Sequence, residues 1–171
     1  MKTKYYISYG SNMNIPEMAY RCPHSRIYGN GTLQGWKLVF NYHADIIETG
    51  EIDDVVPVVV WKITNKQDLA NLDIYEGYPQ YYIKRYIKVE MDDGEIVDAM
   101  VYVMADSRKG VYPPSRSYFQ TILEGYEDNN INVKPLYIAL AYSSNMQNIT
   151  EINQYNPNGI ITKYGGKYEA R

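Results

Sequence analysis

The sequence has few of the residues on which metal and disulfide chemistry depends. Its 171 residues include one cysteine and two histidines, so an internal disulfide is excluded and a Cys/His zinc site lacks ligands. No acidic cluster has the spacing of a calcium-binding loop. We therefore expect no metal ion and no cofactor. The unpaired Cys22 fits a reducing compartment, which makes the cytoplasm the expected location.

Positive charge and long apolar runs are also scarce. Lys and Arg number 17 against 20 Asp and Glu, a formal net charge of −3, so the composition offers no excess of basic residues for nucleic acid. No apolar run approaches the roughly 20 residues that cross a bilayer, and residues 1–10 contain no signal-peptide core. We expect a protein that binds neither nucleic acid nor a membrane.

Tyrosine is abundant where other aromatic residues are rare. The chain has 20 Tyr against 2 Phe and 2 Trp. A bias in codon usage accounts for the overall richness, because Asn, Ile and Lys are plentiful too. This explanation leaves open whether individual tyrosines line a pocket.

Hydrophobic patterning predicts an α+β fold in a single domain, 1–171. Helices are expected to be capped by Asn14 and by a Thr64–Gln67 capping box, and to stop near Gly77 and Gly125. The apolar run at 55–63 indicates a strand buried on both faces. The expected strands are 4–10, 33–43, 55–63, 81–91 and 95–104, and the expected helices are 14–21, 64–77 and 113–126. Residues 145–159 are expected to form helix and loop, and 160–171 a loose tail.

The helix predicted at 64–77 places an acid in an unfavourable position. Leu69, Leu72 and Glu76 follow the spacing i, i+3, i+7, so Glu76 shares the apolar face. It also lies in the last turn, where the helix dipole disfavours negative charge. Both effects raise its pKa, which makes Glu76 a candidate general base unless the side chain turns outward into water. Asp73, one turn earlier, is the second candidate.

Protein nucleophiles are weaker candidates. Ser11 with either histidine lacks the G-x-S-x-G context of a nucleophile elbow. Cys22 and His24 are close in sequence, but a catalytic Cys-His pair is normally brought together by the fold, so this closeness counts for little.

The segment SYGSNM at 8–13 interrupts a strand with Gly-Ser-Asn. It is either a tight turn or a loop that holds a ligand with its backbone amides.

Several segments together resemble one known family. YGSN at 9–12 is followed by VVWKI, by LANLDIYEG ending at Gly77, by YY and by PPSRSY ending at Tyr118. This order resembles the γ-glutamylcyclotransferase-like (AIG2-like) family over residues 5–125, and the likeness beyond Gly125 is slight. The resemblance implies a small mixed β-barrel flanked by helices, which agrees with the α+β pattern.

The same resemblance implies roles for individual residues. The glutamate of the LDxxEG helix, Glu76, is the expected acid/base. Tyr118 is an expected substrate contact. The loop after the first strand is expected to bind the glutamyl part of the substrate, with Tyr6, Ile7, Ser8, Tyr9, Gly10, Ser11 and Asn12.

The implied reaction is cleavage of a γ-glutamyl amide by its own α-amine, which releases 5-oxoproline and a free amine. No protein nucleophile is needed, because the substrate carries one. The alternatives are a non-catalytic binder of an amino-acid derivative on the same fold and an interaction protein that uses exposed tyrosines. Which γ-glutamyl compound is the substrate stays open, and because family members are sometimes dimers, a homodimer is possible.

Overall fold

The computed structural model describes residues 3–144, 161–164 and 167–170, and its centre is a closed five-stranded barrel. Its strands are joined in the order β1 (Lys4–Ser8), β5 (Val55–Ile63), β2 (Arg26–Gln34), β6 (Tyr82–Met91) and β7 (Ile96–Met104). Four pairings are antiparallel, and the parallel pairing of β1 with β7, Tyr6 opposite Met100, closes the ring. The predicted α+β fold with a small mixed barrel is confirmed.

The apolar run forms strand β5, which is buried in the wall of this barrel. The strand lies between β1 and β2, and Val58, Val59 and Val60 are all fully buried. Successive side chains point to opposite faces of a strand, so both faces of β5 are covered. The β3 strand (Trp36–Asn41) and α4 (Lys134–Ser144) contact β5. The prediction of a strand buried on both faces is confirmed.

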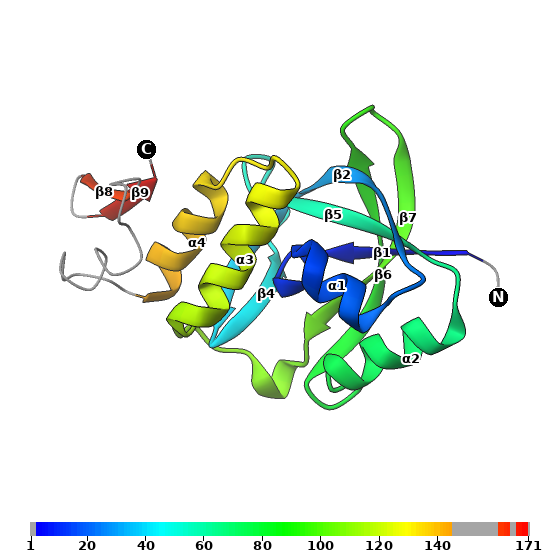
Figure 1. Ribbon diagram of the computed structural model, residues 1–171. Helices are drawn as coiled ribbons and strands as arrows, with labels where there is room; N and C mark the ends of the chain where they lie inside the picture. Colours follow the sequence, from blue (N-terminus) through cyan, green and yellow to red (C-terminus); the bar gives the residue numbers. More distant parts are fainter. Residues whose placement is uncertain (1–2, 145–160, 165–166, 171) are drawn as a thin grey trace.

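Helices surround the barrel on several sides (Figure 1). The α3 (Arg116–Asp128) and α4 helices lie side by side on one side, and α2 (Lys66–Tyr75) lies on the other. The remaining elements are α1 (Ile15–Arg21), β4 (His43–Glu48), the short 3-10 helices η1 (Ser11–Met13) and η2 (Asp106–Arg108), and β8 (Ile161–Tyr164) and β9 (Lys167–Ala170). Among the described residues, no helix is long and apolar enough to cross a bilayer.

The single strand predicted at 33–43 is wrong. The chain turns at Gly35 (φ 78°) and again at Tyr42 (φ 60°), which separates β2 from the antiparallel β3–β4 hairpin. Gly35 takes the left-handed conformation that glycine adopts without steric cost. Apolar residues continue on both sides of each turn, so the pattern reads as one strand.

The helix ends also differ from the prediction. Helix α2 is capped by Asn65, whose side chain accepts from the Gln67 amide, so the Thr64 capping box is wrong. Helix α3 continues through Gly125 to Asp128. Gly125 serves close packing, because a Cβ there would lie 2.6 Å from the Asn14 backbone nitrogen.

The C-terminal part was only partly anticipated. Helix α4 was not predicted, and β8 pairs with β9 in an antiparallel hairpin where a loose tail was expected. The predicted helix and loop at 145–159 lie outside the described residues.

Candidate functional site

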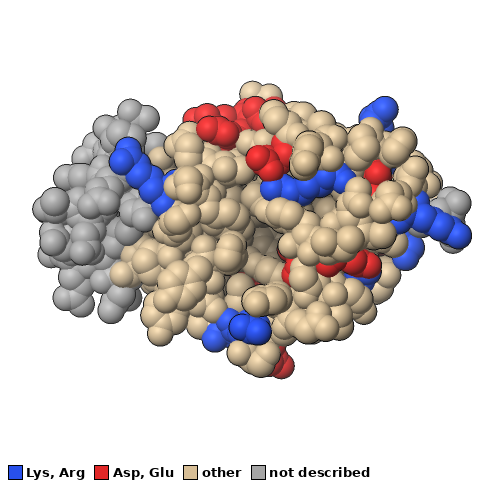
Figure 2. Space-filling model, turned by 60° about the horizontal axis from the view of Figure 1, so that its bottom comes forward, with Lys and Arg blue, Asp and Glu red and all other residues tan. Residues whose placement is uncertain are grey.

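A pocket of about 390 Å³ lies where the first strand, the end of α2 and the start of α3 meet. Figure 2 shows a hollow on this face, bordered mainly by uncharged residues. Seven tyrosines of the described residues line the pocket: Tyr6, Tyr9, Tyr75, Tyr81, Tyr82, Tyr102 and Tyr118. The other lining residues are Gly10, Ser11, Asn12, His43, Ala44, Ile74, Glu76 and Gly77. The pocket therefore joins the YGSN loop to the LDxxEG helix end.

The end of α2 positions Glu76. Gly77 has φ 60°, its amide donates to the Ile74 carbonyl at 3.1 Å, and the Tyr78 amide donates to the Asp73 carbonyl at 2.9 Å. These two bonds form a Schellman motif, in which a left-handed glycine follows the C-cap residue. Glu76 is that C-cap residue, and the motif fixes its backbone at the pocket wall.

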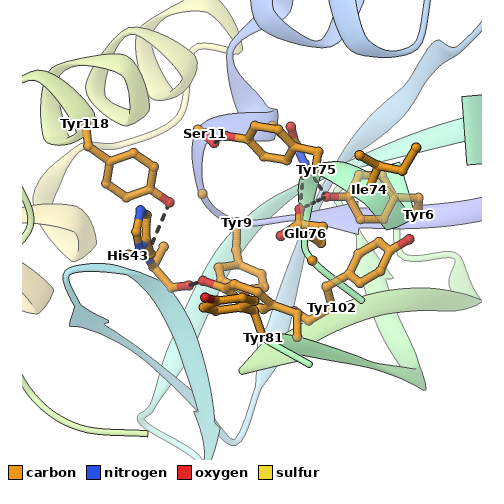
Figure 3. Close-up of a pocket in the computed structure, with 15 residues that line it drawn as sticks. Tyr6, Tyr9, Ser11, His43, Ile74, Tyr75, Glu76, Tyr81, Tyr102 and Tyr118 are labelled. Carbon is orange, nitrogen blue, oxygen red and sulfur yellow. Dashed lines mark hydrogen bonds between the residues drawn. The ribbon is translucent and has the colours of Figure 1, made fainter. Parts of the chain in front are cut away.

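The Glu76 carboxylate is held through one of its oxygens. Its Oε1 accepts from Asn12 Nδ2 at 2.9 Å and from the Tyr6 hydroxyl at 3.5 Å, and Asn12 Nδ2 also donates to the Tyr6 hydroxyl at 2.8 Å. Among the described residues, Oε2 has no hydrogen-bond donor. Figure 3 shows Glu76 between Tyr6 and Tyr75. One oxygen is thus anchored and the other is available in the pocket.

Burial dominates the electrostatics of Glu76. It raises the pKa of this carboxyl to about 7, while the Arg21 charge and the hydrogen bonds from Tyr6 and Asn12 act in the opposite direction. No cation of the described residues pairs with the carboxylate directly. Arg21 reaches it through Asn12, to whose Oδ1 it donates at 2.7 Å. A carboxyl with this pKa exchanges protons readily near neutral pH.

Polar contacts fix the walls opposite Glu76. The Tyr118 hydroxyl accepts from the Ala44 amide at 3.3 Å, and the Tyr82 hydroxyl donates to the Ala44 carbonyl at 2.7 Å. A Cβ on Gly10 would lie 3.1 Å from Ala44 Cβ and 3.4 Å from the Tyr118 hydroxyl. The absent side chain at Gly10 therefore keeps the pocket open beside Tyr118.

The structure brings together most of the predicted site residues. Glu76 and Tyr118 face the pocket with Tyr6, Tyr9, Gly10, Ser11 and Asn12. The side chains of Ile7 and Ser8 do not line it: Ile7 is fully buried in the core, and Ser8 Oγ bonds to the Val59 carbonyl and the Trp61 indole. The roles of all these residues in substrate binding stay predictions.

Sequence reasoning missed several pocket residues. Tyr75 precedes Glu76 and shares a hydrogen bond with Ser11 Oγ at 2.9 Å, while Tyr82 and Tyr102 enter from neighbouring barrel strands. The aromatic richness was the signal, but nothing in the sequence separated these tyrosines from the others. Arg21 was missed as well, although Glu17 four residues earlier marks it as an ion-pair partner.

The weaker candidates have other partners. Asp73 pairs with Lys84 Nζ at 2.5 Å and accepts from the Tyr102 hydroxyl, and it does not line the pocket. Cys22 Sγ contacts the Asp68 carbonyl and the His24 ring contacts the Asp68 carboxylate. Within the described ranges no group of three His, Cys, Asp or Glu side chains is placed to hold a metal ion.

Comparisons with known proteins agree on one family. A family model described as gamma-glutamyl cyclotransferase, AIG2-like, matches residues 6–120. Gamma-glutamylcyclotransferase from Bos taurus is 30% identical over 137 residues, which cover 74% of this chain and 71% of that protein. The Homo sapiens protein of the same name is 29% identical over the same shares. A solved gamma-glutamyl cyclotransferase structure is similar with a TM-score of 0.71 and 25% identity, covering 85% of this chain and 90% of that one.

Proposed function

The chain belongs to the gamma-glutamyl cyclotransferase, AIG2-like family, and from this premise we propose that it cleaves a γ-glutamyl amide to 5-oxoproline and a free amine. Glu76 is the proposed general acid and base. The observation that carries the proposal is a partly buried carboxyl, with a pKa of about 7, whose second oxygen has no donor among the described residues and faces the pocket.

The pKa of Glu76 matches the first step of the reaction. The substrate's α-ammonium, with a pKa near 8, must lose a proton before it can attack. An ordinary glutamate is almost four units weaker as a base, a deficit of roughly 5 kcal/mol, whereas a carboxyl at about 7 leaves about one unit, or roughly 1.4 kcal/mol. Burial of Glu76 thus removes most of the mismatch.

The proposed reaction needs no group beyond the substrate and Glu76. Glu76 Oε2 takes a proton from the α-ammonium, and the amine nitrogen forms a bond to the γ-carbonyl carbon. The protonated Glu76 then delivers this proton to the amide nitrogen and takes the second proton from the ring nitrogen as the bond between the carbon and the amide nitrogen breaks. Glu76 passes this second proton to the released amine. The products are the five-membered 5-oxoproline ring and the free amine, and Glu76 is again ionised.

The loop at 9–12 is proposed to hold the glutamyl chain curled. Intramolecular attack reaches effective molarities on the order of 10⁵ M when the reacting atoms are held in place. The amides of Ser11 and Asn12 have no acceptor among the described residues, so they are proposed to bind the α-carboxylate or the developing oxyanion. Tyr118 and the open space beside Gly10 complete this half of the pocket.

The alternative is a non-catalytic binder of an amino-acid derivative. It would need the tyrosine-lined pocket, but a carboxylate there would work against an anionic ligand. Glu76 therefore favours the enzyme. A cytoplasmic location and a possible homodimer stay predictions.

The test is turnover of a panel of γ-glutamyl amino acids and γ-glutamylamines, followed by mass spectrometry. We expect 5-oxoproline and the free amine in equal amounts. Release of glutamate would mean hydrolysis and would contradict cyclisation. Binding of panel members without any product would support the non-catalytic alternative.

A further inference from the structure

Arg21 lies behind the pocket wall and joins three elements. Its side chain is 12% exposed, although it carries a full charge. One guanidinium nitrogen pairs with Glu17 on α1, and another donates to Asn12 Oδ1 in η1 at 2.7 Å. The guanidinium carbon lies 3.7 Å from the ring centroid of Tyr75 on α2. The two residues it contacts beyond α1, Asn12 and Tyr75, both flank Glu76.

The contact with Asn12 decides which way the amide faces. A guanidinium has donors only, so the Asn12 oxygen must face Arg21 and the NH₂ group must face away. Both hydrogens of this NH₂ are then used, one toward Glu76 Oε1 at 2.9 Å and one toward the Tyr6 hydroxyl at 2.8 Å. With the amide reversed, an oxygen would face the carboxylate and repel it.

The contact with Tyr75 supports the other side of Glu76. The Tyr75 ring packs against the guanidinium while its hydroxyl shares a hydrogen bond with Ser11 Oγ at 2.9 Å. Cation–π contacts of this kind contribute most when the cation is partly desolvated, as Arg21 is. The ring therefore spans from α2 to the YGSN loop over the site, as Figure 3 shows.

We propose that Arg21 is a positioning residue for the acid/base, because it fixes the Asn12 amide and the Tyr75 ring so that Glu76 keeps Oε1 anchored and Oε2 free for the substrate. This inference rests on the proposed function of Glu76. It gives the partly exposed ion pair of Arg21 with Glu17 a role in the chemistry.

Arg21 carries the charge that acts most strongly on Glu76. Five tyrosines face the carboxyl from β1, the segment after it, β6, β7 and α3. Burial raises the pKa of each, so they are neutral near pH 7: Tyr6, Tyr9, Tyr82, Tyr102 and Tyr118. His43 and Tyr75 also line the pocket, and Asp73 and Lys84 pair with each other beside Tyr102. Arg21 is the cation that lowers the pKa of Glu76 against burial.

Three variants test the inference: Arg21→Met, Arg21→Lys and Glu17→Gln. The readouts are the acidic limb of kcat/KM against pH and the ¹³C NMR titration of the Glu76 carboxyl, whose signal is identified by its loss in Glu76→Gln. The titration needs no substrate. A wild type without turnover would refute the proposed function, while the titration would still decide whether Arg21 acts on Glu76.

We expect Arg21→Met to move both readouts to higher pH by about one unit or more, and kcat/KM at pH 6 to fall about tenfold with KM little changed. Arg21→Lys should return the titration toward the wild type because the charge is kept. Its kcat should stay reduced, since an ammonium cannot hold Asn12, Glu17 and the Tyr75 ring together. Glu17→Gln should move the titration to lower pH, because it removes a negative charge beside Arg21.

A folded Arg21→Met variant with an unchanged titration and an unchanged acidic limb would overturn the inference. If Arg21→Met does not fold, Arg21→Lys and Glu17→Gln test the inference. A Glu17→Gln titration that stays in place, together with full kcat in Arg21→Lys, would equally overturn it.

Discussion

Asp73 and Glu76 lie three residues apart at the same end of α2, and their surroundings could hardly differ more. Asp73 is paired with Lys84 and accepts from the Tyr102 hydroxyl. Glu76 has no ion-pair partner in the part of the chain that the structure describes, and its carboxylate is anchored by Asn12 and Tyr6. Its burial raises the pKa to about 7. The partners of a carboxylate therefore decide whether it stabilises the fold or exchanges protons.

The largest difference between the two acids is expected in turnover. Glu76→Gln keeps the shape and the hydrogen bond from Asn12 but cannot carry a proton, so kcat should fall about 10² to 10⁴-fold. Asp73→Asn should keep kcat within an order of magnitude of the wild type, because Asp73 lies outside the pocket. Release of 5-oxoproline under saturating substrate measures both.

Full activity in Glu76→Gln would move the base elsewhere. A comparable loss in both variants would mean that the two acids act together. Either result would show that Glu76 and Asp73 do not divide into a catalytic and a structural acid. Circular dichroism spectra of both variants serve as the control for folding.

The two acids should also differ in stability, with opposite signs. The pKa of Glu76 is raised from 4.5 to about 7 in the folded protein, so the folded state binds the extra proton between these values. Its contribution is then fully present below about 4.5 and is lost as the pH rises through about 7. Glu76→Gln removes this ionised, partly buried group, so above pH 7 the variant should be more stable than the wild type, by on the order of 3 kcal/mol.

At pH 4.5 that gain should vanish. Asp73→Asn should instead lower the free energy of unfolding by about 1–2 kcal/mol at neutral pH, because it leaves the half-buried Lys84 without its anion. Urea unfolding of both variants at pH 4.5 and pH 8 measures the differences. A gain of Glu76→Gln that is the same at both pH values would show that the carboxyl is not perturbed.

The same two residues show how far the sequence reaches. Glu76 was found because Leu72 and Gly77 fix both the face and the end of the helix, and these are local signals. The ion pair of Asp73 with Lys84 could not be predicted, because Lys84 lies on β6 and contacts Asp73 only in the folded barrel.

Other parts of the fold also divide into those set by local sequence patterns and those set by contacts distant in sequence. The barrel strand β5 and the Asn14 cap of α1 follow from local patterns and were predicted. The turns at Gly35 and Tyr42 were not, because a left-handed residue inside a continuing apolar pattern leaves no local trace. Nor was Arg21, whose partners Asn12 and Tyr75 are brought to it by η1 and α2.

The pH dependence of kcat/KM in the wild type measures the ionisation of Glu76 in the free enzyme. For a γ-glutamyl amino acid whose side chain carries no charge, we expect the acidic limb of kcat/KM to be centred at about pH 7, the pKa of Glu76. A limb centred near 4.5, the value of an ordinary glutamate, would contradict it.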